Sequence, residues 1–210
     1  MKLMVNKTQQ GQAQSGFTLV EIMITVLVLA VVLNFGVPAM GAFVERNRLK
    51  SAAEDVYSKL NYARSESIKQ SRQLVMHFSA NGTDTWSFGI GSSSGCDLSL
   101  TDPTAAGACA IDVDASAAGT TMVLKVTKNK SGDADYQNIK MDLTNASNTS
   151  INPTYNISFD QVRGTATAGK IVLTSESGWI IRNEISPLGH VKVCSPAGNN
   201  KISGYPECAS

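Results

Sequence analysis

The 210-residue sequence has little of several residue types on which catalytic and nucleic-acid-binding sites depend. It contains two histidines, 6% aromatic residues, and 18 Lys and Arg against 17 Asp and Glu, so its formal charge is +1. Two histidines leave little material for a histidine-rich metal or catalytic site, and the near-zero charge excludes nucleic-acid binding through bulk charge alone. The P-loop, the G-x-S-x-G element and the dinucleotide fingerprint are absent too. We therefore expect no enzyme and no cofactor.

Hydrophobic residues make up 42% of the chain, but they are unevenly distributed. The first 16 residues are polar and contain Lys2 and Lys7 but no acidic residue, and residues 17–37 then form an apolar run. As a helix this run would measure about 30 Å, the thickness of a bilayer core. No small-residue cleavage site ends the run, as a secretory signal would require. The two lysines predict that the leader stays cytoplasmic while the rest is exported.

Glu21 interrupts the apolar run. A carboxylate in the hydrocarbon layer costs on the order of a few kcal/mol, so it should be paired or neutralised there. If the chain were cut before Phe17, the new α-amine of the same or a neighbouring copy would offset this charge. An ordinary single-span anchor that tolerates one acidic residue is the alternative.

The run GFTLVEIMITVLVLAVV at residues 16–32 resembles the class III signal of type IV pilins and type II secretion pseudopilins. The resemblance implies that a prepilin peptidase cuts after Gly16, that the amine of Phe17 is methylated, and that Glu21 acts in subunit assembly. Pro38 falls where many pilins have a proline that loosens the helix, since proline lacks an N–H and clashes with the previous turn.

The helical period continues beyond the apolar run and predicts one helix from about Phe17 to Gln70. We expect a leader peptide at 1–16, a transmembrane half-helix at 17–40, an amphipathic half-helix at 41–72 and a β-rich domain at 73–210. The apolar stripe expected to pack on a sheet consists of Leu49, Ala53, Val56, Leu60, Ala63 and Ile68.

After Arg72 the hydrophobic period becomes two, which is typical of strands. Asn81-Gly82 predicts a turn between the first two strands. Residues 91–120, rich in Gly, Ser and Ala, are expected to form a long loop, either a recognition surface or a surface excursion. A long helix on an antiparallel sheet makes the expected fold α+β and type IV pilin-like. Strands are expected at 74–78, 85–90, 121–127, 139–143, 155–159, 170–174, 179–185 and 191–194.

Residues 157–194 resemble the C-terminal part of the GspH/FimT group, which includes the H pseudopilin of type II secretion and the FimT and FimU minor pilins. The resemblance implies a minor pilin of the tip or priming complex of a type IV pilus, anchored in the inner membrane with a periplasmic domain. Its partners would be the other minor pilins, the major pilin, prepilin peptidase and the inner-membrane assembly platform. Twitching motility, adhesion and DNA uptake would depend on it indirectly. A type II secretion pseudopilin is the alternative.

Some members of this group bind DNA through the arginines of a Gly-Arg-x-Arg turn, and a DNA-binding minor pilin is a further alternative. This chain has Gly189-His190-Val191-Lys192 at that place. Neutral histidine supplies no steady charge, and lysine lacks the arginine fork. His190, Lys192 and Lys201 would make a weak DNA contact at most. We favour the hypothesis that residues 189–192 form a solvated turn without a DNA-binding role.

The four cysteines form two pairs that are close in sequence, although three connectivities are allowed. We favour Cys96–Cys109 and Cys194–Cys208, as suits an exported domain. A zinc site and a catalytic thiol are the alternatives, but the chain has no C-x-x-C. The acidic pairs Asp112/Asp114 and Asp133/Asp135 are expected to be solvated rather than to bind a cation. We expect no metal.

Overall fold

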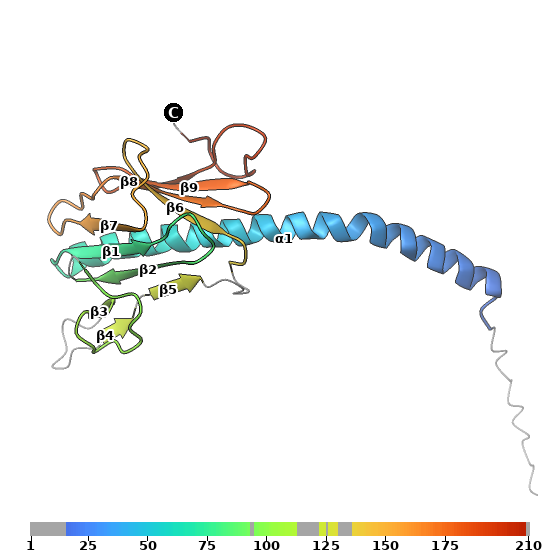
Figure 1. Ribbon diagram of the computed structural model, residues 1–210, viewed down its shortest axis with the longest axis horizontal. Coiled ribbons are helices and arrows are strands. Elements are labelled where there is room, and N and C mark those ends of the chain that lie inside the picture. The colour runs from blue at the N-terminus through green and yellow to red at the C-terminus, as the bar shows by residue number, and fades with distance from the viewer. Residues whose placement is uncertain (1–15, 93–94, 113–121, 125, 130–135, 209–210) are drawn as a thin grey trace, which may run out of the picture. The chain divides into compact units, whose positions relative to one another are not determined.

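The structure, a computed structural model, describes residues 16–92, 95–112, 122–124, 126–129 and 136–208. This part of the chain contains one helix, α1 (Leu19–Lys69), followed by strands only (Figure 1). The strands are β1 (Leu74–Ser79), β2 (Trp86–Gly91), β3 (Ala110–Asp112), β4 (Met122–Leu124), β5 (Val126–Asn129), β6 (Lys140–Asn145), β7 (Thr154–Phe159), β8 (Gly169–Thr174), β9 (Ile180–Ile185) and β10 (Val191–Cys194).

The chain divides into two compact units, Met1–Ala42 and Phe43–Ser210. The described residues of the first unit include the start of α1, whose large apolar side chains are exposed. The second unit holds the rest of α1 and all the strands. Every buried hydrophobic residue of the described chain lies at position 49 or later. The second unit therefore contains all of the core that the described residues form.

Both ends of α1 are capped. At the start, Thr18 Oγ1 accepts a hydrogen bond from the Glu21 N–H at 3.2 Å. At the end, Ser71 takes a positive φ of 50°. The Arg72 N–H bonds the carbonyl of Ser67 at 3.1 Å and the Ser71 N–H bonds that of Ile68 at 3.2 Å, which together form a Schellman motif. The helix thus starts two residues later and ends one residue earlier than the sequence predicts.

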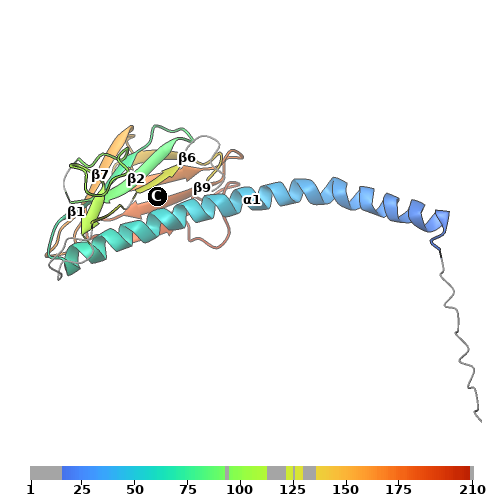
Figure 2. The ribbon, with the colours of Figure 1, turned by 90° about the horizontal axis from the view of Figure 1, so that it is seen from below.

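The strands form two four-stranded antiparallel sheets, with orders β5-β2-β1-β7 and β10-β9-β8-β6, and a small β3-β4 pair. Side chains of both large sheets and of α1 belong to one hydrophobic cluster. The C-terminal half of α1 runs along these sheets (Figures 1 and 2). The predicted α+β architecture, a long N-terminal helix with antiparallel sheet, is confirmed.

The two sheets differ in how their outer faces are covered. Burial alternates along β8 and β9, so the second sheet has one face on the core and one toward solvent. β1 is buried on both faces over most of its length. The outer face of its sheet is covered by the segment closed by Cys96–Cys109: a Cβ at Gly89 would lie 2.9 Å from Leu98 Cδ2, and one at Gly91 would lie 2.9 Å from Cys96 Cβ.

Three expectations need correction. Residues 121–127 do not form one strand, because β4 pairs with β3 while β5 pairs with β2. Residues 91–120 are not loop throughout, since they include β3. Ile68 is 48% exposed and lies off the apolar stripe. Its neighbour Ser67 takes the inward position, where Ser67 Oγ donates to the Phe159 carbonyl at 3.1 Å.

Candidate functional site

The processing residues precede the helix. Gly16 and Phe17 lie before the first residue of α1, and Phe17 is 78% exposed. A Cβ placed on Gly16 would meet no atom within 4 Å. Among the described residues, nothing therefore packs against the backbone at Gly16.

Glu21 sits in the first turn of α1, three residues after Thr18. A carboxylate at this position favours the helix start because it faces the positive end of the helix dipole. The sequence carries a signal for this local role, the capping pattern Thr-x-x-Glu at residues 18–21, in addition to the expected pairing of Glu21 with an α-amine. Glu21 thus has a local role in addition to the predicted one.

The first part of α1 presents apolar side chains on all sides. Leu19, Met23 and Leu27 are 76%, 65% and 65% exposed, and the other large apolar residues up to Leu33 are more than half exposed as well. By the criteria of length and hydropathy for a membrane crossing, no helix in the described ranges qualifies. The predicted span at 17–40 stays a prediction. Pro38 lies within α1 and its side chain is outside the described residues, so its loosening effect is a prediction too.

The turn at Gly189 is joined to a second turn and to the helix. Gly164 and Gly189 both have positive φ, 62° and 75°. Arg64 Nε donates to the Gly164 carbonyl at 3.2 Å, and Arg64 Nη2 donates to the Leu188 carbonyl at 3.4 Å. The chain just after the first turn also touches the second turn directly, because the Ala166 N–H bonds the Pro187 carbonyl at 3.1 Å. We call the turns 160–164 and 186–190, with Arg64, the turn pair.

The structure does not unite the three predicted DNA-contact residues into a basic site. His190 and Lys192 are exposed beside the turn pair. Lys192 lies opposite Glu184 on the neighbouring strand. Lys201 Nζ pairs with Glu207 Oε1 at 2.7 Å, and this ion pair holds the pKa of Glu207 below its usual value. Both lysines therefore lie beside a carboxylate.

Sequence reasoning missed Arg64, which the fold brings to this turn. Arg64 lies 100 residues before Gly164, and no local pattern connects the two. Its position just after the buried Ala63, at the edge of the apolar stripe, was the available signal. Both of its described hydrogen bonds go to backbone carbonyls. Arg64 therefore acts as a positioning residue for the turn pair.

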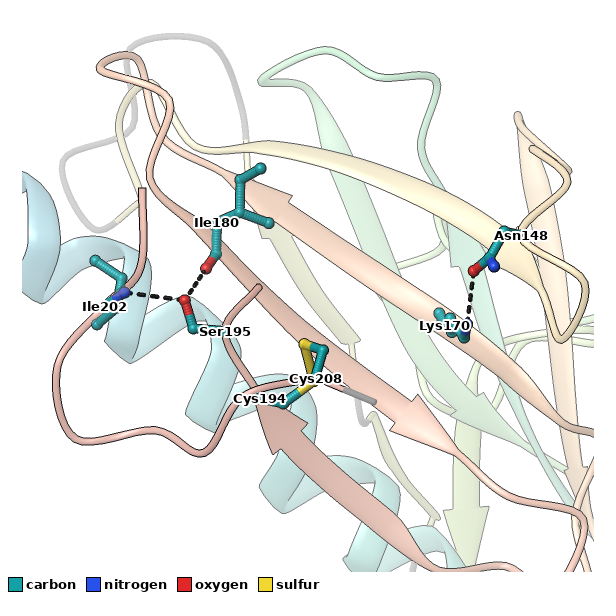
Figure 3. The surroundings of a disulfide bond; sticks show 7 residues. All are labelled: Asn148, Lys170, Ile180, Cys194, Ser195, Ile202 and Cys208. Atoms are coloured by element: carbon teal, nitrogen blue, oxygen red, sulfur yellow. Dashed lines mark hydrogen bonds between the residues drawn. A yellow bond between two sulfur atoms is a disulfide. The ribbon is translucent and has the colours of Figure 1, made fainter. Parts of the chain in front are cut away.

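The structure contains both predicted disulfides, Cys96–Cys109 and Cys194–Cys208. Figure 3 shows the second one, which ties the C-terminal segment to β10. Beside it the buried Ser195 Oγ donates to the Ile180 carbonyl at 2.8 Å and accepts from the Ile202 N–H at 2.9 Å. These contacts fix residues 195–208 over the edge of the sheet.

Within the described ranges, one group of side chains has metal-ligand spacing. Ligand atoms of Glu184, Cys194 and Cys208 lie within 4.8 Å of one another. The two sulfur atoms are bonded to each other, so neither is a thiolate that could bind zinc. Of the predicted acidic pairs, Asp112 ends β3, while Asp114, Asp133 and Asp135 lie outside the described residues.

The fold and the processing segment together define a type IV pilin-like subunit. The model of the prokaryotic N-terminal methylation motif matches residues 11–33. The family model described as Type II transport protein GspH matches residues 52–189, more than half of the chain, so the chain belongs to the GspH family.

Among solved structures, the chain is similar to the type IV minor pilin FimU of Pseudomonas aeruginosa strain PAO1. The identity is 21%, the match covers 72% of this chain and 91% of that one, and the TM-score is 0.42. No curated protein matches the sequence.

Proposed function

We propose that this chain is a minor pilin, a structural subunit of the tip or priming complex of a type IV pilus. The observation that carries the proposal is the exposed apolar start of α1, which lies within the segment that the methylation-motif model matches, residues 11–33. Leaving a large apolar side chain in water forgoes about 1.5–3 kcal/mol each. A helix that exposes such residues on every side needs a lipid or protein environment to cover them.

Two environments, one before assembly and one after it, would cover the apolar side chains of this helix. Before assembly, residues 17–40 lie in the inner membrane and the unit Phe43–Ser210 faces the periplasm. After cleavage at Gly16, the subunit enters the filament and its apolar helix packs against the helices of neighbours. The Glu21 carboxylate then pairs with the Phe17 amine of a neighbour, which removes the cost of burying either charge alone.

The proposed partners follow from this scheme. Prepilin peptidase acts at Gly16 and Phe17, the inner-membrane assembly platform moves the subunit, and other minor pilins and the major pilin contact it in the filament. Family membership supports assembly with pilin-type subunits. Twitching motility, adhesion and DNA uptake would depend on the filament and only indirectly on this chain.

A second candidate is a pseudopilin of the type II secretion system. The matched family is described as a type II transport protein, and its model covers residues 52–189. The same processing segment, helix and globular unit would then serve a periplasmic pseudopilus.

Deleting the gene and scoring surface pili, protein secretion and DNA uptake side by side distinguishes these functions. The minor-pilin proposal predicts few pili with secretion intact, and both should return with the wild-type gene. Lost secretion with normal piliation would establish the pseudopilin function instead. Lost DNA uptake with normal pili and normal secretion would contradict both proposals and indicate direct DNA binding.

A further inference from the structure

The turn pair carries the most exposed apolar side chains of the unit Phe43–Ser210. Within the described residues of that unit, Val162 and Leu188 are the two most exposed large hydrophobic residues, at 80% and 66%. They lie on the two turns that Arg64 connects. The half-exposed Ile68 is next to them, because its Cδ1 would lie 3.2 Å from a Cβ at Gly164. Clustered exposed apolar residues mark interaction surfaces more often than scattered ones do.

The turn that carries Val162 is held rigidly in its exposed position. Asp160 Oδ1 accepts hydrogen bonds from the backbone N–H of Val162 at 3.0 Å and of Arg163 at 2.8 Å, and these bonds lower the pKa of the Asp160 carboxyl. The Gly164 N–H also bonds the Asp160 carbonyl at 3.0 Å. A turn ordered before binding loses little conformational entropy when a partner binds.

The charged groups around these apolar side chains are the basic Arg64, Arg163 and Lys192 and the acidic Asp160 and Glu184, so cations outnumber carboxylates by one. Arg163, His190 and Lys192 are exposed. Glu66, the acidic residue of this stretch of α1, is buried and accepts hydrogen bonds from Lys69 and Gln70. The turn-pair surface, defined as Val162, Arg163, Leu188, His190 and Ile68, thus combines aliphatic side chains with the exposed cation of Arg163. It fits a partner with exposed carboxylates and apolar groups.

The chain itself carries a surface of that kind. Residues 73–124 contain five Asp and no Lys or Arg. Within this region, the acidic loop 96–109 is closed by a disulfide and exposes Asp97 and Asp102. Leu100 and Pro103 of the same loop are half-buried, so part of their apolar surface is accessible.

We propose that the turn-pair surface of one copy binds the acidic loop of a second copy. The two surfaces differ, so the contact is heterologous and leaves one free surface of each kind on the pair. The inference specifies which surfaces of the globular unit take part in assembly, and it rests on the function proposed above.

Duplex DNA fits the turn-pair surface less well than a second copy does. The hydrogen bonds of Arg64 are directed to backbone carbonyls, and Lys201 is paired with Glu207. The exposed aliphatic tips Val162 and Leu188 would stand where DNA binding requires phosphate contacts. Against an apolar and acidic protein loop the same side chains would be buried.

The test measures self-association of a fragment spanning residues 43–210 by sedimentation velocity over a concentration series. The fragment contains the entire described core, so it should fold alone. We expect association at low salt that weakens as salt screens the charges. Arg163→Glu should weaken it at least about tenfold. Adding Asp97→Asn and Asp102→Asn to Arg163→Glu should restore association, because asparagine keeps the turn hydrogen bonds and removes the repulsion.

Two further variants separate this contact from general effects of charge and folding. Lys140→Glu reverses an exposed cation outside both surfaces and should associate like the wild type. Leu188→Ser should weaken association without changing its dependence on salt. Circular dichroism should show all variants folded.

Three results would overturn the proposal: a fragment that stays monomeric at low salt, an Arg163→Glu variant that associates normally, or failure of the asparagine substitutions to restore association. Duplex DNA bound at the turn pair by a fragment that does not self-associate would also overturn it. None of these results bears on pilus number in the deletion strain, so failure here is distinguishable from failure of the proposed function.

Discussion

Arg64 Nε donates a hydrogen bond to the carbonyl oxygen of Gly164 at 3.2 Å, across 100 residues of sequence. The same guanidinium reaches the Leu188 carbonyl at 3.4 Å. One side chain of α1 therefore holds the turn after β7 and the turn before β10. These contacts connect the helix to residues 157–194, the segment that resembles the GspH/FimT group.

Replacing Arg64 should destabilise the globular unit. Arg64→Ala leaves two carbonyls without their charged donor, and we expect the free energy of unfolding to fall by about 1–2 kcal/mol. Arg64→Lys should recover only part of this, because an ammonium cannot reproduce the arginine fork. Urea denaturation of the 43–210 fragment measures both. Arg48→Ala, which removes an exposed bond to Gln137, is the matched control and should cost less than about 0.5 kcal/mol. Equal costs at positions 64 and 48 would contradict the positioning role.

Gly189→Ala should be far more costly than Gly204→Ala. Both glycines have positive φ, 75° and 97°, so alanine at either is strained by about 1–2 kcal/mol. Only at Gly189 would the added Cβ collide with the carbonyl oxygen of Gly164, while at Gly204 it would meet nothing within 4 Å. We expect Gly189→Ala to cost at least about 2 kcal/mol more. Equal melting temperatures for the two variants would show that the turns are not in tight contact.

The long helix was predictable because its signals are local. The apolar run, the three- and four-residue spacing and the Thr-x-x-Glu start all lie along one continuous segment. The disulfides were predictable because each pair is close in sequence, with separations of 13 and 14 residues. In both cases the partners that determine the structure are neighbours along the chain.

The remaining features depend on contacts between distant segments. The division of residues 121–127 follows from the different partners β3 and β2. Ile68 is a different case, because it lies five residues after Ala63 and the three- and four-residue spacing itself gives the inward position to Ser67. Arg64 had no local signal for its contact with Gly164. Periodicity predicts which face is apolar, but not which segments meet there.

Removing either disulfide should lower stability by about 3 kcal/mol in the chain-entropy model, since each closes a loop of similar length. The variants Cys96→Ala/Cys109→Ala and Cys194→Ala/Cys208→Ala test this in the 43–210 fragment by thermal denaturation. A reductant should lower the melting temperature of the wild type, and lower that of each double variant by less. A melting temperature that is insensitive to reductant would contradict the stabilising role.

Glu45 should contribute to the loss of stability in acid. Glu45 accepts hydrogen bonds at 2.7 Å from both the N–H and the Oγ of Ser177. Burial alone would raise its pKa, but the hydrogen bonds from Ser177 and Ser175 and the charge of Arg46 outweigh burial and hold the pKa below the usual 4.5. Because the pKa is lowered, ionised Glu45 stabilises the folded chain at pH values above its usual pKa. This stabilisation is lost as the pH falls through the pKa of Glu45 in the folded state.

Glu45→Gln should therefore reduce the loss of stability on acidification. Ser177→Ala should act in the same direction, because it weakens the hydrogen bonds that lower the pKa of Glu45. Denaturation of the 43–210 fragment over a pH series from about 6 to about 3 measures the decline. Profiles of both variants that coincide with the wild type would show that Glu45 does not contribute.

The assembly role of Glu21 is tested most directly by the amount of this subunit in sheared surface filaments, compared between two variants. Glu21→Gln removes the carboxylate but keeps the N–H that bonds Thr18, while Thr18→Ala removes the cap but keeps the carboxylate. Both should be exported and cleaved after Gly16. If Glu21 pairs with a neighbour's amine, Glu21→Gln loses most of the subunit from the filaments and Thr18→Ala retains it. Normal filament incorporation of Glu21→Gln would contradict the assembly role.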